Sequence, residues 1–111
     1  MRPLSCFSRV GKGSAPVVIG GAVGRTWGAY CELQQLWVAP AHRRRGLDAD
    51  LVRAFEQRAE RRGCHTFHLE TFSFQAPSLY RALDYVVKHK LHGFAPGVVN
   101  YLMVREVAGS G

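Results

Sequence analysis

The stretch LWVAPAHRRRGLD, residues 36–48, decides how this chain folds. The apolar segment before Pro40 is predicted to end there as a strand, because proline lacks the amide proton that a central strand needs. A basic loop follows, and the residues from Gly46 to Arg62 have the apolar periodicity of a helix. Amides at a helix start lack intrahelical partners and carry the positive end of the helix dipole. The loop and the helix start therefore predict a phosphate-binding site, which the adjacent arginines strengthen.

The predicted helix over residues 46–62 is amphipathic. Its buried stripe comprises residues that recur at helical spacing: Leu51, Val52, Phe55 and Ala59. The charged residues between them, Glu56 included, are predicted to face solvent. Gly63 is the expected stop, because glycine readily adopts the left-handed conformation that ends many helices.

Strands are predicted on both sides of this unit. Upstream they cover residues 4–10, 16–24 and 30–39, with the first two forming a hairpin and residues 25–28 closing the second. Side-chain alternation places four residues of the third strand on one face: Glu32, Gln34, Leu36 and Val38. Downstream, a short helix opens at Pro77, and strands cover residues 64–72, 85–90 and 98–107.

The predicted order β-β-β-α-β-α-β-β describes an α/β fold with one mixed sheet. The long helix makes a crossover, so the strands that flank it should run parallel and the others antiparallel. With 111 residues, the chain is expected to form a single domain over residues 1–111, with residues 108–111 as a flexible tail.

The hydrophobic fraction and the net charge limit the classes of protein to which this chain can belong. A hydrophobic fraction of 47% excludes a largely disordered chain. The net charge is +7, and most of the excess lies in residues 1–46, which hold seven basic residues and one acid. Such a surface suits an anionic partner, which could be a phosphorylated cofactor, a nucleic acid or a membrane surface. The alternative is a solvated basic face that binds no partner.

The three cysteines, Cys6, Cys31 and Cys64, are odd in number and widely spaced. This favours reduced thiols and a cytoplasmic location over a disulfide framework. We recognise neither a secretory signal nor an apolar segment of membrane-spanning length. The histidines lack the acidic or cysteine partners of a zinc site, so no metal is expected.

Two motifs resemble those of the GNAT acyltransferase superfamily. Residues 36–40, followed by Arg43-x-x-Gly46-x-Asp48, are similar to motif A, and residues 76–85 are similar to motif B, written A-x-x-(F/L)-Y-x-x-x-G-(F/Y). The resemblance runs from about Val17 to Glu106. It implies a GNAT-like acyl-CoA N-acyltransferase fold, acetyl-CoA as the acyl donor, and a primary amine of a small molecule or peptide as the acceptor.

The resemblance also implies roles for individual residues. Backbone groups at Trp37 and Val38 would bind the acetyl carbonyl and the pantetheine arm. The loop around the pyrophosphate would comprise Arg43, Arg44, Arg45, Gly46 and Leu47, with Asp48 in its last position. Tyr80 would donate a proton to the coenzyme sulfur, the alternative being a core aromatic. Glu32 would be the base, the alternative being an exposed carboxylate paired with an arginine, and Gln34 could orient a water.

Two aspartates depart from the motifs. Asp84 replaces a motif B glycine, which is mild because aspartate tolerates a left-handed conformation. Asp48 replaces a glycine or alanine of motif A, where a carboxylate can cap the helix amides and repel a pyrophosphate. A second hypothesis is therefore a non-catalytic CoA-binding or degenerate module of the same fold. A third, less favoured, is a nucleic-acid binder that uses the arginine run.

The length of the chain adds one expectation. Members of the family begin with a strand and two helices, and here only a few residues precede the first predicted strand. The acceptor pocket would then be open, or completed by a second copy, and the exposed apolar surface would favour a homodimer.

Overall fold

The computed structural model describes residues 1–11, 16–43 and 45–107. The strands are β1 (Arg2–Val10), β2 (Val17–Trp27), β3 (Tyr30–Val38), β4 (Thr66–Phe72), β5 (Val86–Leu91) and β6 (Asn100–Glu106). The helices are α1 (Leu47–Arg61), α2 (Pro77–Ala82) and a 3-10 turn, η1 (Pro40–His42). The predicted order of strands and α-helices is confirmed, and η1 is an addition. The predicted tail, residues 108–111, lies outside the described residues.

The second strand is longer than predicted. It continues through residues 25–27, which pair with Tyr30–Glu32 of β3, and the chain reverses at Gly28 and Ala29. Gly28 has a positive φ of 57°, a conformation that glycine adopts without steric cost. The prediction that residues 25–28 close the strand at Gly24 was wrong because the turn itself needs only two residues.

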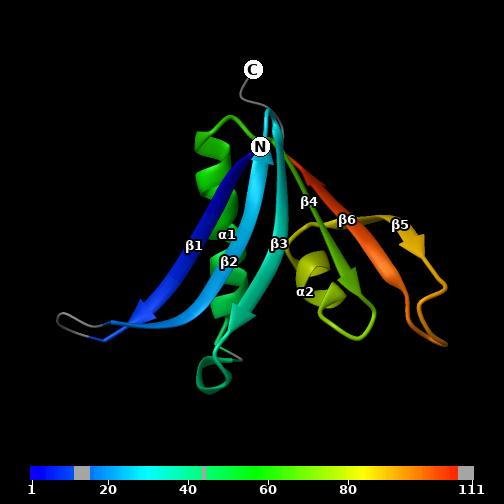
Figure 1. The fold of residues 1–111 in the computed structure, drawn as a ribbon, viewed down its shortest axis with the longest axis horizontal. Helices are drawn as coiled ribbons and strands as arrows, with labels where there is room; N and C mark the ends of the chain where they lie inside the picture. Colours follow the sequence, from blue (N-terminus) through cyan, green and yellow to red (C-terminus); the bar gives the residue numbers. More distant parts are fainter. Residues whose placement is uncertain (12–15, 44, 108–111) are drawn as a thin grey trace.

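The sheet has the order β1-β2-β3-β4-β6-β5. As predicted, β3 and β4 run parallel and all other neighbours are antiparallel. The parallel pairing is short, joining Tyr30–Leu33 of β3 to Thr66–Leu69 of β4. Beyond this point the two strands diverge, and Figure 1 shows the gap that opens between their carboxyl ends.

A bulge at Gln34 changes which side chains share a face. Gly24 pairs with Leu33 and Val23 pairs with Gln35, so Gln34 is an extra residue in β3. Before the bulge Leu33 lies in the core beneath α1; after it Val38 packs against that core. Glu32 therefore faces away from α1. The prediction that Glu32 and Val38 share a face was wrong because a bulge shifts the alternation by one residue.

Gly24 makes this bulge possible. A Cβ atom there would collide with the backbone carbonyl oxygen of Glu32 and would lie 2.8 Å from the ring of Phe55. Substitution Gly24→Ala is expected to lower the free energy of unfolding by about 1–3 kcal/mol, the usual cost of overpacking. Urea unfolding measures the loss. At Gly21 a Cβ would meet the side chains of Trp37 and Phe7, which can move, so Gly21→Ala should cost clearly less. Equal costs would contradict the argument.

The main core lies between α1 and the sheet. Buried residues of the helix, Val52 and Phe55 among them, pack against β1, β2 and β3, and Tyr80 and Leu83 join the same cluster from α2. Both α-helices thus supply this core, and the opposite face of β1–β3 carries no helix among the described residues. None of the described helices is long and apolar enough to cross a membrane.

Glu56 is buried, with 2% of its surface exposed. Its Oε2 accepts a hydrogen bond of 2.7 Å from the Tyr85 hydroxyl, and its Oε1 accepts bonds from Arg53 at 2.8 Å and Arg105 at 3.1 Å. Arg53 also donates to the carbonyl of Leu83 at the end of α2. The prediction that Glu56 faces solvent was wrong because these cationic and hydroxyl partners compensate a buried carboxylate. The network ties α1 to α2 and β6.

Asp84 has a φ of 73°. The left-handed conformation inferred from its motif position is therefore confirmed. It follows Leu83, the C-cap of α2, and its carboxylate lies 3.6 Å from Arg53. This departure from motif B leaves the turn into β5 intact.

Candidate active site

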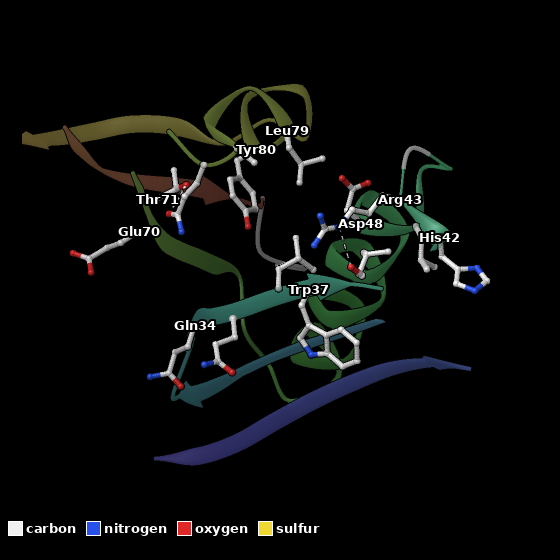
Figure 2. Close-up of a pocket in the computed structure, with 15 residues that line it drawn as sticks. Gln34, Trp37, His42, Arg43, Asp48, Glu70, Thr71, Leu79 and Tyr80 are labelled. Atoms are coloured by element: carbon white, nitrogen blue, oxygen red, sulfur yellow. Dashed lines mark hydrogen bonds between the residues drawn. The ribbon is translucent and has the colours of Figure 1, made fainter. Parts of the chain in front are cut away.

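A cleft of about 1120 Å³ fills the gap between the diverging ends of β3 and β4. The start of α1 closes one end and α2 covers one side (Figure 2). Six predicted site residues line it together: Trp37, Val38, Arg43, Leu47, Asp48 and Tyr80. The structure thus brings the two motifs, which are separated in sequence by residues 49–75, to one cavity.

Four other predicted site residues do not line the cleft or are not described. Gly46 is the N-cap of α1, with a φ of 75° and a ψ of 7°, and turns the loop into the helix. Arg45 is exposed beside it. Arg44 lies outside the described residues. Glu32 lies at the last rungs of parallel pairing, just before the strands diverge.

Sequence reasoning missed part of the lining. Residues from β4 and the segment after it also contribute: Glu70, Thr71, Gln75, Ala76 and Leu79. A signal existed, because the predicted parallel pairing places the carboxyl ends of both strands at the same sheet edge. Gln34, predicted to orient a water, does line the cleft.

The phosphate-binding end combines Arg43 with the first turn of α1. The Arg43 Nε donates a 3.2 Å hydrogen bond to the carbonyl of Val38, which fixes the guanidinium at the end of β3. Helix amides and a guanidinium suit the phosphates of coenzyme A. Past Leu33, the edge of β3 that faces β4 no longer pairs with it. The backbone groups of that edge are therefore free to form hydrogen bonds with an extended ligand. The residues present therefore fit the acyl donor, with one exception.

That exception is Asp48. Its Oδ1 accepts a 2.8 Å hydrogen bond from the amide of Ala49. The carboxylate thus caps one amide of the first turn, which is the capping predicted for it from the sequence. It also adds a negative charge to the wall of the cleft.

Tyr80 projects from α2 into the cleft (Figure 2). Burial raises the pKa of its hydroxyl above the usual 10.0, and the carboxylate of Asp48 raises that pKa further. The phenol therefore stays protonated throughout the neutral range. A protonated hydroxyl in a water-poor cleft can donate to a developing anion. Tyr80 also packs edge-on against Tyr85, with ring centroids 5.8 Å apart, which matches the predicted alternative of a core aromatic; its role as the proton donor stays a prediction.

Glu32 is held by two partners. Its Oε1 accepts a 2.7 Å hydrogen bond from Arg25, and its Oε2 lies 3.2 Å from the Nε2 of His68. The arginine pairing is the predicted structural alternative. His68 was missed, and its partnership with Glu32 follows from the parallel register, which places the two residues side by side. The other ring nitrogen of His68 is buried without a partner among the described residues.

The acid candidate lines the cleft, and the base candidate lies just beyond its lining on the other face of the sheet. Tyr80 belongs to the cluster beneath the helices, whereas Glu32 and His68 lie on the sheet face away from α1. A group held between the diverging strands would therefore contact the proton donor Tyr80, with the proton acceptor Glu32 near the closed end of the gap. This arrangement suits a transfer in which an amine loses a proton and a leaving group gains one.

Comparisons with known proteins agree with this geometry. The Acetyltransferase (GNAT) family profile matches residues 3–85. Blasticidin-S acetyltransferase from Streptomyces morookaense is 32% identical over 107 residues, covering 96% of this chain and 79% of that protein. An acetyltransferase from Bacillus cereus superposes with a TM-score of 0.85 at 24% identity, covering 96% of this chain and 74% of that one.

A further solved structure has the donor bound. It is yncA from Salmonella typhimurium with its cofactor acetyl-CoA, with a TM-score of 0.69 at 23% identity, covering 86% of this chain and 61% of that one. The solved structures share the fold, and the family profile covers both motifs up to Tyr85. The chain belongs to the GNAT family and is an acetyl-CoA-dependent N-acetyltransferase.

Proposed function

We propose that this enzyme acetylates a primary amine of a small molecule, with Tyr80 as the acid and Glu32 as the base. The observation that carries the assignment of roles is that Tyr80 lines the cleft, while the Glu32–His68 pair lies just beyond its lining, at the last paired rungs of β3 and β4 from which the cleft opens. The choice of a small acceptor is supported by the likeness to Blasticidin-S acetyltransferase over 96% of the chain. Blasticidin S is therefore the first acceptor to test, ahead of a peptide amine.

Acetyl-CoA supplies the thioester from which the acetyl group is transferred. Arg43 and the first-turn amides of α1 hold the phosphates, and backbone groups at Trp37 and Val38 orient the extended arm. Glu32 takes a proton from the acceptor ammonium, directly or through a water, while His68 and Arg25 fix its carboxylate. The amine nitrogen bonds to the acetyl carbon, the carbon–sulfur bond breaks, and Tyr80 gives its proton to the departing sulfur. The second proton of the nitrogen passes to solvent, from which Tyr80 is reprotonated. The exposed Arg45 adds to the basic surface of the loop.

Release of the CoA thiol, with mass spectrometry of the product, tests this function. We expect blasticidin S to gain one acetyl group and a peptide with a free N-terminal amine to remain unmodified. Acetylation of the peptide alone would contradict the proposed acceptor class. Binding of acetyl-CoA without turnover on either amine would favour the non-catalytic alternative.

Asp48 should weaken donor binding. At a separation of about 5 Å, one unit-charge pair is worth roughly 0.8 kcal/mol in water and roughly 3 kcal/mol at an effective dielectric of 20. Substitution Asp48→Asn is therefore expected to tighten acetyl-CoA binding by roughly fourfold to a hundredfold, as measured by calorimetry. Asp50→Asn is the matched control, because Asp50 lies in the same turn but is exposed. Unchanged affinity in Asp48→Asn would place its charge away from the phosphates.

We also propose a cytoplasmic homodimer. The sheet face away from α1 exposes several large apolar side chains, among them Phe7 (40%), Tyr30 (45%) and Trp37 (42%), which a second copy could cover. The three cysteines are all unpaired thiols, which supports a reducing compartment. Light scattering at micromolar concentration tests the assembly, and a monomeric mass would contradict it. Fractionation of the source cells tests the location.

A further inference from the structure

Three phenylalanines form a cluster just outside the cleft. The ring of Phe72, at the end of β4, stacks on Phe74 with centroids 5.4 Å apart and meets Phe94 edge-on at 5.0 Å. Phe74 is 69% exposed and Phe94 is 52% exposed. Two loops far apart in sequence thus present aromatic surface to solvent at one place.

The cluster adjoins the acceptor side of the cleft. Thr71 and Gln75, which bracket Phe72 and Phe74 in sequence, both line the cleft. Along β4, Phe72 shares a face with Glu70 and His68, because alternate residues of a strand point the same way. This is the face away from α1, on which Glu32 also lies.

Hydrogen bonds between the two loops hold the rings in place. The amide of Ser73 donates to the carbonyl of Val99 at 2.8 Å, and the amide of Val99 donates to the Ser73 hydroxyl at 3.1 Å. The side-chain oxygen of Gln75 accepts a 2.9 Å bond from the amide of Phe72. These bonds fix the backbone on either side of the cluster, and the ring of Phe72 contacts both exposed rings. A site fixed in this way lowers the entropic cost of binding a ligand.

The charge beside the cluster suits an amine. Glu70 is an exposed carboxylate, about 7 Å from Phe72 along the strand at the usual rise per residue. On the same face Glu32 is paired with Arg25, so Glu70 supplies the local negative charge. A cationic amine attached to a flat ring would match both features.

We infer that Phe72, Phe74 and Phe94 form an acceptor subsite that binds a planar aromatic ring, with Glu70 guiding the attached ammonium group toward Glu32. This inference rests on the proposed function, since it assigns the substrate class of the same site. Aromatic rings prefer offset-stacked or edge-to-face partners, and the outward surfaces of Phe74 and Phe94 offer both. The subsite thus selects aromatic amines over aliphatic ones of equal size.

Two matched amines test the inference: 2-phenylethylamine and 2-cyclohexylethylamine. Their equilibrium binding to the CoA-saturated protein is measured by NMR titration, which needs no turnover. We expect the native protein to bind the phenyl compound about three- to tenfold more tightly. The double variant Phe74→Leu, Phe94→Leu keeps apolar surface but removes two rings, and should bind the two amines equally. Trp27→Leu is the control, because Trp27 is 74% exposed at a hairpin turn far along the sheet and should keep the preference.

Equal affinities in the native protein, or a preference that survives in the double leucine variant, would overturn the inference. So would a change from dimer to monomer in the leucine variant with no change in amine preference, because the cluster would then be a contact between copies. Failure of the proposed function is distinguishable: the aromatic preference would persist in binding while no amine is acetylated. Acetylation without any aromatic preference would instead remove the subsite and leave the function.

Discussion

Substitution Tyr80→Phe is expected to lower kcat by on the order of 100-fold, the usual contribution of a positioned acid. The variant loses only the hydroxyl, and the ring still fills its place against Tyr85. Acetyl-CoA affinity should therefore change by less than about twofold, since the hydroxyl acts on the departing sulfur and not on the phosphates. Thiol release measures kcat, with any amine that supports turnover, and calorimetry measures donor binding.

The pH profile separates an acid from a structural tyrosine. Activity requires the protonated phenol, whose pKa is raised by burial and by Asp48. Native activity should therefore persist until the pH exceeds this raised pKa, and the loss should begin at lower pH in Asp48→Asn. Tyr101→Phe is the control, because Tyr101 packs under Arg81 and Lys90 and should leave kcat unchanged. Equal kcat in native and Tyr80→Phe enzymes would remove Tyr80 from the mechanism.

Substitution Glu56→Ala is expected to lower the free energy of unfolding by about 3–5 kcal/mol, the cost of breaking a buried ion pair by removing one partner. The loss arises because the Tyr85 hydroxyl would stay buried without its acceptor and the half-buried Arg105 would lose its carboxylate partner. Burial, followed by the charge of Glu56, raises the pKa of Tyr85 in the native protein, so that hydroxyl is a neutral donor and needs an acceptor. Urea unfolding measures the change.

Glu60→Ala is the matched control for this experiment. Glu60 lies one turn further along α1 and is exposed, so its loss should cost less than about 0.5 kcal/mol. Glu56→Gln should fall between the two, because the amide keeps the volume but lacks the charge. A cost below about 1 kcal/mol for Glu56→Ala would mean that the network contributes little to stability.

Local patterns predicted the elements of the fold well. Each signal acts within a few residues of the chain. The apolar stripe predicted helix α1, Pro40 and Gly63 marked the ends of β3 and α1, and Pro77 marked the start of α2. The crossover rule then gave the parallel pairing of β3 and β4. The spacing of the two motifs brought Arg43, Asp48 and Tyr80 to one cleft, although their chemical roles remain predictions.

The missed features depend on partners distant in sequence. Glu56 lies at the edge of the apolar stripe, and its burial depends on Arg105, which is 49 residues away. The bulge at Gln34 depends on the register with β2, which alternation along one strand cannot reveal. His68 reaches Glu32 only through the pairing of two strands. Helical and strand periodicity describe a segment alone, so they could not indicate these contacts.

The short pairing of β3 and β4 has a consequence for solubility. Past Leu33 and Leu69 each strand presents an edge inside the sheet, where backbone donors and acceptors lack a neighbouring strand. An exposed edge of this kind is normally a template for aggregation. Here the two edges diverge, and Tyr80, Leu79 and Leu47 line the space between them, so a flat foreign sheet has no room to dock. The divergence of the two strands, which makes room for a slender ligand, therefore also protects their unpaired edges from aggregation.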